Sequence, residues 1–235
     1  VQTGTNRVEL ADPEGVLLEL DNVFFYEEDY YFSSWFSNTS FTLKDSVSGN
    51  DTASAQAGWQ DAQDTINQLE SLLYAEDPDW EGSSAIIDVE SFIKYYFIQE
   101  LSANKDAGKT STYLYKDGAS DLLHVGPAWD YDCALGNMLS DSNGGNPTLD
   151  FIKNLETLNK GPEKVNYWYT QLFRNEEFAS LVHEMYTSSL RDKILEVPDK
   201  IDVQAEALDA SNSPTMNFTR WNILGTQAVL GEQAH

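Results

Sequence analysis

Basic residues are scarce in this chain. Its 235 residues include 14 Lys and Arg against 39 Asp and Glu, which gives a formal net charge of -25. A surface that binds nucleic acid or an anionic membrane needs a basic stripe, so this balance argues against both as partners. The excess of acids is typical of the solubilising coat of a secreted or cell-surface protein, and some of these acids are available as metal ligands.

Cysteine, histidine and long apolar runs are also scarce. Cys133 is the only cysteine, which excludes an internal disulfide framework and a thiolate zinc cluster. His124, His183 and His235 are too far apart in the sequence to suggest a histidine-based metal site. No apolar run approaches the length of a transmembrane helix, so we expect no membrane insertion.

Apolar and aromatic residues, by contrast, are plentiful. Hydrophobic residues make up 41% of the chain, with 6 Trp, 12 Tyr and 11 Phe. This composition is typical of a globular protein and not of a disordered one. The length suffices for one sizeable core or two small lobes.

The first part of the chain predicts two strands and two helices. Residues 16–21 alternate between apolar and acidic side chains, and residues 41–44 form a second short strand. Apolar residues at helical spacing predict a helix over residues 55–74. A further helix should cover residues 89–101, with Asp88 as its N-cap.

The rest of the chain predicts a hairpin followed by helices. Residues 112–115 and 122–125 read as paired strands around the turn dipeptide Asp117-Gly118. From Leu149 onward the pattern is helical, with breaks expected at residues 161–162, 198 and 213–214. The order of strands, helices, hairpin and helices indicates an α+β fold with a helical second half.

Three carboxylates gather around the hairpin. Asp106 lies in a polar loop before it, and Asp130 and Asp132 follow it directly after Trp129, which we expect to be buried. On an extended segment, residues i and i+2 face the same side, so Asp130 and Asp132 should converge. Two negative charges this close together need a cation or hydrogen-bond donors to offset their repulsion.

This set of acids suits more than one chemistry. Phosphoryl transfer on a kinase-like scaffold needs one carboxylate at the acceptor hydroxyl and others to hold metal. In protein kinases a metal-binding Asn follows the catalytic Asp by five residues, and here Ser111 stands five residues after Asp106. Alternatively, Asp130 and Asp132 are an acid/base pair or two solvated acids, and Asp106 is a plain loop residue.

Two other motifs are incomplete. Residues 108–110 imitate the end of a P-loop, but Ala103 stands where the motif needs Gly, and a helix leads in. A chitinase-like glycosidase would need a Glu two residues after Asp132, and Ala134 occupies that position. Both readings are therefore disfavoured.

Taken together, these motifs resemble the spore coat protein H (CotH) family of atypical secreted kinases. The resemblance covers most of the chain in the family's order. The matching segments are residues 6–9, 15–21, 41–44, 88–92, 104–106, 111–115, 126–132 and 217–221. It implies a single kinase-like domain over residues 1–235, mainly the helical C-terminal lobe, with a short hairpin carrying the metal-binding Asp. The nucleotide-covering N-terminal lobe is expected to be largely absent.

The resemblance also implies an activity and a set of roles. It implies transfer of phosphate from ATP to Ser or Thr of secreted or surface proteins, with Mg, Ca or Mn as the cation. Asp106 would be the catalytic base. Asp130, Asp132 and Ser111 would hold the metal, with Ser111 in place of the family's usual Asn. Candidate cofactor contacts are Lys44, towards phosphate, and Asn104.

The main alternative is a non-catalytic surface or adhesion module. Such a module would keep the kinase-like fold, bind a cation structurally, and offer its acidic, aromatic-rich face to a partner. Under either hypothesis the expected location is extracellular or at the cell surface.

Overall fold

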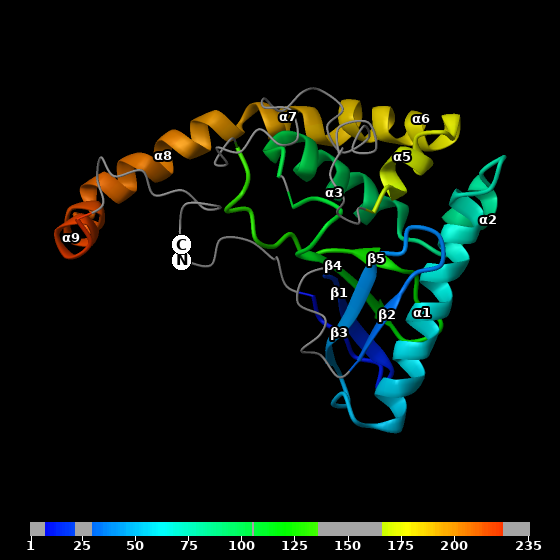
Figure 1. The fold of residues 1–235 in the computed structure, drawn as a ribbon. Coiled ribbons are helices and arrows are strands. Elements are labelled where there is room, and N and C mark those ends of the chain that lie inside the picture. The colour runs from blue at the N-terminus through cyan, green and yellow to red at the C-terminus, as the bar shows by residue number, and fades with distance from the viewer. Residues whose placement is uncertain (1–7, 22–29, 105, 136–165, 223–235) are drawn as a thin grey trace. The chain divides into compact units, whose positions relative to one another are not determined.

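The computed structural model describes residues 8–21, 30–104, 106–135 and 166–222. The chain divides into two compact units, Val1–Phe178 and Ala179–His235. The first unit contains a β-sheet and the helices that pack on it, and the second is helical throughout its described part (Figure 1).

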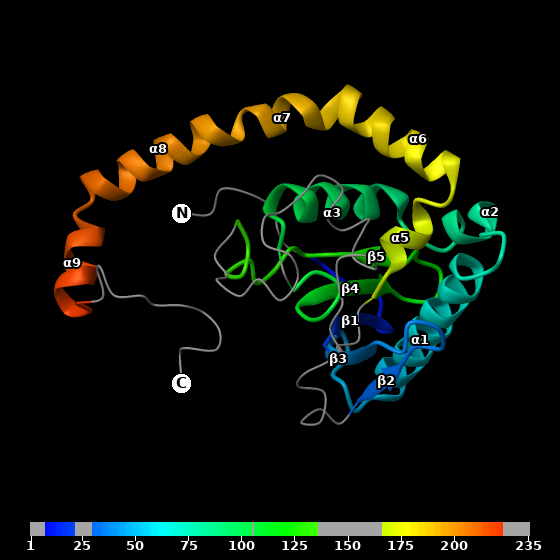
Figure 2. The same ribbon diagram turned by 45° about the horizontal axis from the view of Figure 1, so that its top comes forward.

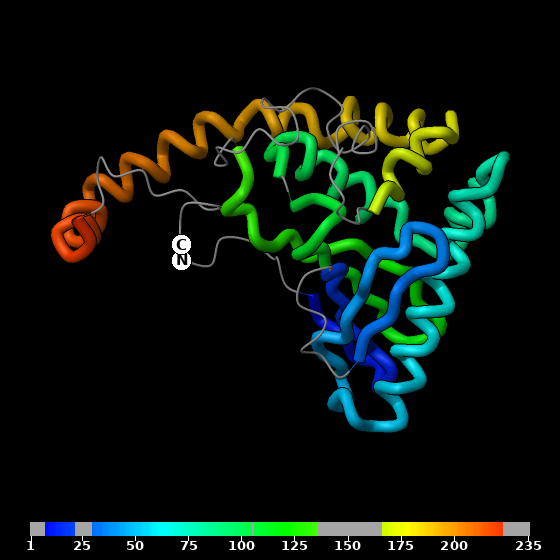
Figure 3. The backbone as a smooth tube through the Cα atoms, in the orientation of Figure 1, coloured from blue at the N-terminus to red at the C-terminus, as the bar shows by residue number. Residues whose placement is uncertain are grey.

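A five-stranded antiparallel sheet is the centre of the first unit. Its strands lie in the order β2-β3-β1-β4-β5, so β1 has neighbours from both the beginning and the middle of the chain. Figure 3 shows the green β4 beside the blue β1. The strands are β1 (Gly15–Leu20), β2 (Tyr31–Ser33), β3 (Ser40–Ser46), β4 (Thr112–Asp117) and β5 (His124–Val125).

Strand β1 follows the alternation that its sequence predicts. Val16, Leu18 and Leu20 are almost completely buried on the face that packs against α1 (Ala53–Leu73). Glu19 lies on the opposite face, opposite Thr42 of β3 and Tyr113 of β4. The predicted strands at residues 16–21 and 41–44 are therefore confirmed.

The predicted helices are also confirmed. Helix α1 begins after Thr52, whose side chain accepts a hydrogen bond from the Ala55 backbone at 3.1 Å. After the short α2 (Trp80–Ser84), α3 (Val89–Ser102) begins after its N-cap Asp88, whose carboxylate accepts a hydrogen bond from the Ser91 backbone at 2.7 Å. Figures 1 and 2 show α1 along the sheet and α3 near β5, which it contacts.

Helix α5 (Trp168–Leu172) joins the sheet to α3 through aromatic packing. The Trp168 ring stacks on Phe41 of β3, with centroids 5.8 Å apart, and on Phe92 of α3 at 6.4 Å. The hydroxyl of Tyr169 donates to the backbone carbonyl of Phe92 at 2.7 Å. This cluster closes the core of the first unit, because one short helix contacts both the sheet and α3.

The C-terminal unit consists of consecutive helices. Helix α6 (Glu176–Met185) leads into it, and no side chain of the three helices α7, α8 and α9 is buried. The predicted breaks at Pro198 and residues 213–214 coincide with the starts of α8 and α9. The helical prediction for residues 149–165, including its break at 161–162, lies outside the described residues. The elements are η3 (Tyr186–Leu190), α7 (Arg191–Leu195), α8 (Val197–Ala210) and α9 (Ser213–Arg220).

The fold class is α+β, as the sequence predicts. The hairpin around Asp117-Gly118 forms, with Gly118 at φ 86° and with β4 and β5 paired at Leu114–Val125 and Tyr115–His124. It extends a sheet that β1 and β3 have already built, so the β portion is larger than the sequence indicated. Among the described helices, none is both long and apolar enough to cross a membrane.

Candidate functional site

The sheet brings the candidate site residues to one of its edges. In the register of the sheet, Leu20 at the end of β1 pairs with Thr112 at the start of β4. The chain after β5 leaves at this same edge, where the Gly126 backbone N–H donates to the Tyr113 carbonyl at 2.8 Å. Segments far apart in sequence therefore meet where β1 and β5 end and β4 begins.

Asn104 ties two of these segments together. Helix α3 ends at Ala103 in the left-handed conformation (φ 45°, ψ 48°), which turns the chain into the Asp106 loop. The Asn104 side chain is 2% exposed. Its Oδ1 accepts from the Asp106 backbone N–H at 3.2 Å, and its Nδ2 donates to the Asp130 carbonyl at 3.2 Å. The amide thus positions two loops, and its contact with a cofactor stays a prediction.

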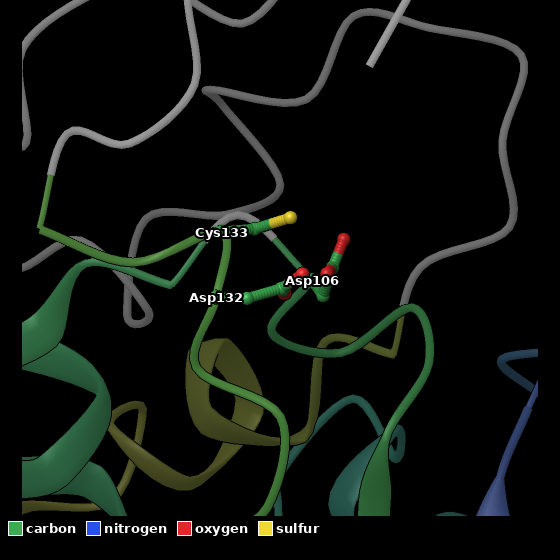
Figure 4. Close-up of side chains that lie close together, drawn as sticks. All are labelled: Asp106, Asp132 and Cys133. Atoms are coloured by element: carbon green, nitrogen blue, oxygen red, sulfur yellow. The ribbon is translucent and has the colours of Figure 1, made fainter. Parts of the chain in front are cut away.

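Asp106, Asp132 and Cys133 form a group of possible metal ligands, and we call them the Asp106 cluster. One ligand atom from each lies within 4.8 Å of the others. Figure 4 shows the Asp106 and Asp132 carboxylates next to each other, with the Cys133 thiol beside them. Two carboxylate oxygens this close suit a hard divalent cation, and the Cys133 sulfur would be a softer third ligand once its thiol loses the proton.

The electrostatics of the cluster reflect crowding and partial burial. Burial is the main cause that raises the pKa of Asp106, and the charges of Asp130 and Asp132 act in the same direction. A hydrogen bond with Cys133 and the charge of Lys109 partly offset this. Burial, followed by the charge of Asp106, raises the pKa of the Cys133 thiol to about 12. The thiol is therefore protonated at neutral pH and can donate to a carboxylate.

Asp130 lies beside this cluster but in a different conformation from the one expected. Its φ is 58°, so it stands at a left-handed turn and not on an extended segment. The argument that residues i and i+2 face the same side is therefore wrong for Asp130 and Asp132. Ser111, also left-handed at φ 53°, donates its hydroxyl to Asp130 Oδ2 at 3.2 Å. The structure thus pairs Asp130 with Ser111, and Asp132 with Asp106.

Trp129 corrects a second expectation. Its side chain is 61% exposed and not buried, and it contacts the Tyr113 ring edge-on at 6.4 Å between centroids. The left-handed turn at Asp130 follows it directly, so the segment leaves the sheet before it reaches the core. Trp129 therefore lies on the surface beside Tyr113 of β4.

Lys44 points to that same face of the sheet. Its Nζ lies 3.1 Å from Glu19 Oε2, and its side chain is 27% exposed while that of Glu19 is 9% exposed. Burial is the main cause that raises the pKa of Glu19, and Lys44 acts against it. Lys44 is thus held on the sheet by a partly buried ion pair with Glu19, while its contact with phosphate stays a prediction.

Three further residues at this edge were missed from the sequence. Cys133 was used only to exclude a disulfide framework and a thiolate zinc cluster, although its position next to Asp132 was a signal. Asp21 is 3% exposed, and its Oδ1 accepts from the Thr110 hydroxyl at 3.3 Å. The position of Asp21, directly after an apolar strand, was the sequence signal that could have identified it. The third residue, Glu19, had no such signal, because its role depends on the ion pair with Lys44 on the neighbouring strand.

Comparison with known proteins agrees with the resemblance noted in the sequence. The model of the family described as CotH kinase protein matches residues 3–234, nearly the whole chain. No curated protein and no solved structure gave a significant match. Because the family match extends from the first strand to the last described helix, this chain belongs to the CotH kinase family.

Proposed function

We propose that this chain is an atypical protein kinase domain that transfers phosphate from ATP to Ser or Thr hydroxyls of secreted or surface proteins. The observation that carries the proposal is the Asp106 cluster, in which ligand atoms of Asp106, Asp132 and Cys133 lie within 4.8 Å of one another. Membership of the CotH kinase family supports a kinase-like activity. The excess of acids supports an extracellular or cell-surface location.

The donor set fits a divalent cation. Asp132 would hold it in the Asp106 cluster, and Asp130 with the Ser111 hydroxyl is the second candidate pair beside it. Carboxylate and hydroxyl oxygens favour Mg, Ca or Mn over softer metals. When bound, the cation would neutralise charge on the phosphate oxygens.

Asp106 is the residue that we assign as the base. Its loop is fixed because its own backbone N–H donates to Asn104, and Asn104 in turn donates to the Asp130 carbonyl. A carboxylate held this way can accept the proton of an acceptor hydroxyl without reorganising its loop. Asn104 acts in this assignment by positioning Asp106, whatever further contact it makes with ATP.

Lys44 of β3 and Glu19 of β1 form an ion pair on one face of the sheet. The 3.1 Å ion pair keeps the ammonium of Lys44 in place and removes the cost of leaving Glu19 unpaired. We assign Lys44 to the phosphates of ATP, because an ammonium is a compact cation that suits them. Glu19 orients it.

The test is a phosphate-transfer assay with radiolabelled ATP, a mixture of secreted acceptor proteins, and Mg, Mn or Ca in turn. Asp106→Asn should lower the rate by about 100- to 10,000-fold, which is the usual contribution of a positioned base. Asp202→Asn, in the exposed part of α8, is the control for loss of one negative charge. A near-normal rate for Asp106→Asn, with an unchanged melting temperature, would remove Asp106 from the mechanism. Cation binding without transfer under any condition would instead favour the non-catalytic surface module.

A further inference from the structure

A cavity lies between α3 and β5, separate from the Asp106 cluster. Its volume is about 440 Å³, within the range of sites that enclose small ligands or a few side chains. One wall comes from the first three turns of α3, and the other from β4, β5 and the segment that follows β5. We call it the α3–β5 groove; it is lined by Asp88, Glu90, Ser91, Lys94, Tyr95, Ile98, Tyr115, His124, Val125, Gly126, Pro127 and Ala128.

The walls combine a flat ring surface with apolar side chains. The rings of Tyr115 and His124 stack with an interplanar angle of 4° and centroids 4.6 Å apart. Ile98, which is 40% exposed, stands on the α3 side, and Pro127 and Ala128 form the opposite side. Such a surface suits an aliphatic side chain or the stem of a Lys or Arg.

The charge in and around the groove is negative. Glu90 and Lys94 form an ion pair on α3 and largely cancel each other. Asp88 and Asp121 remain, one on each side of His124. The carboxylate of Asp88 lies 3.6 Å from His124 Nδ1, and that of Asp121 lies 3.2 Å from His124 Nε2. Burial is the main cause that raises the pKa of Tyr115, and the charges of Asp88 and Asp121 raise it further. A cationic ligand is therefore the one favoured electrostatically.

Both walls of the groove lead directly into the candidate site. Helix α3 ends at Ser102, shortly before Asp106 in the sequence. The segment that includes Ala128 continues to Asp130. The 14 residues of α3 span about 21 Å at about 1.5 Å per residue. An extended peptide covers that length with about six residues.

We propose that the α3–β5 groove binds a basic segment of the acceptor polypeptide, with a Lys or Arg about six residues from the phosphorylated hydroxyl. The apolar wall takes the stem of that side chain, and the acidic end of the groove near Asp88 takes its charge. This inference rests on the proposed kinase function and adds a substrate class to it.

The experiment measures peptide binding without ATP or metal. The probes are two fluorescein-labelled peptides that carry one Ser and an Arg-Leu-Arg group about six residues to its N- or C-terminal side. A third peptide has Glu in place of each Arg. At least one Arg peptide should bind the full chain in fluorescence anisotropy, and the Glu peptide should not.

Variants then locate the binding. Glu90→Lys should lower the affinity for the Arg peptide by at least about tenfold, because it places a second cation beside Lys94. Glu206→Lys, on the exposed surface of α8, makes the same change in net charge and should leave the affinity nearly unchanged. Ile98→Ser removes the apolar wall without changing charge and should also weaken binding. Thermal melts confirm that each variant is folded.

Several results would overturn the inference. Equal losses of affinity in Glu90→Lys and Glu206→Lys would show that the Arg peptide binds only through attraction to the overall charge of -25. Equal binding of the Glu peptide, or full affinity in both Glu90→Lys and Ile98→Ser, would place the peptide elsewhere. Because no phosphate is transferred in this assay, binding that persists alongside an inactive enzyme would reject the kinase assignment and not the groove.

Discussion

Glu70 shows how a single buried carboxylate fixes part of this structure. It is fully buried in α1, yet it accepts hydrogen bonds from four donors on two other segments. The Phe36 and Ser37 backbone N–H groups lie at 2.8 and 3.1 Å, and the Ser37 hydroxyl at 2.6 Å. The fourth donor is the indole of Trp168, at 2.9 Å. Glu70 therefore joins α1 to the β2–β3 turn and to α5.

We predict that Glu70→Ala destabilises the chain by about 3–5 kcal/mol, because it leaves buried donors without an acceptor. Urea unfolding followed by tryptophan fluorescence measures the loss. Glu70→Gln keeps one acceptor oxygen and should cost less. Gln68→Ala, on the exposed side of the same helix, should cost little. A loss for Glu70→Ala no greater than that for Gln68→Ala would contradict this account.

Asp132 is the residue on which cation binding should depend most. It belongs to the Asp106 cluster, whereas Asp130 accepts a hydrogen bond from Ser111. A cation that binds only the folded chain stabilises it by about 2.7 kcal/mol at a hundredfold excess over its dissociation constant. Excess Ca, Mg or Mn should therefore raise the melting temperature, and Asp132→Ala should abolish the rise.

Two further variants separate this site from the general acidity of the surface. Asp130→Ala should weaken the cation-dependent rise without abolishing it. Asp202→Ala, on α8, should leave it unchanged. If all three variants keep the full rise, the cation binds elsewhere on the acidic surface and the cluster is not a metal site.

At the scale of secondary-structure elements, the centre of the first unit is the contact between β1 and α1. Gly58 allows α1 to approach the chain just before β1, because a Cβ at this position would lie 1.8 Å from the Glu14 carbonyl oxygen. The buried face of β1 packs against the same helix. The distance between helix and sheet thus depends on the absence of a side chain.

We predict that Gly58→Ala destabilises the chain by about 1–3 kcal/mol through overpacking. Helix propensity alone would give the opposite sign, since Ala is favoured over Gly in a helix by about 1 kcal/mol. The sign of the shift in the urea midpoint therefore decides between the two effects. Gln60→Ala, at an exposed position two residues further along α1, is the control and should be close to neutral. Stabilisation by Gly58→Ala would show that the close approach does not exist.

At the scale of the whole molecule, the net charge of -25 should itself be a source of instability. Like charges on a compact surface repel one another, and unfolding separates them. The Debye length falls from about 30 Å at 0.01 M salt to about 10 Å at 0.1 M, so added salt weakens this repulsion.

We predict that sodium chloride raises the melting temperature over this range in the wild type and in Asp132→Ala alike. The effect is diffuse, so removing one carboxylate should hardly change it, unlike the response to divalent cations. Differential scanning calorimetry at several salt concentrations measures it. A melting temperature that falls or stays constant with salt would show that local ion pairs, such as Lys116 with Asp61 at 2.7 Å, outweigh the net repulsion.

Much of the local structure could be predicted because its causes lie within a few residues. The alternation in β1, the N-cap Asp88 and the turn at Gly118 all depend on neighbours in sequence, and the structure confirms each. The order of elements also sufficed for the α+β class. The positions of Trp129 and Asp130 could not be predicted in this way, because a left-handed turn redirects the chain there.

The sequence by itself determined the acidic character, the strands and helices, the family resemblance and the acids that we assign to the candidate site. Only the tertiary structure decided how those acids are grouped, with Asp132 beside Asp106 and Cys133, and Asp130 beside Ser111. It also paired Lys44 with Glu19 across two strands. The physical reason is that these groupings depend on sheet register and on the left-handed turns that follow the strands. Both are set by packing between segments that are distant along the chain.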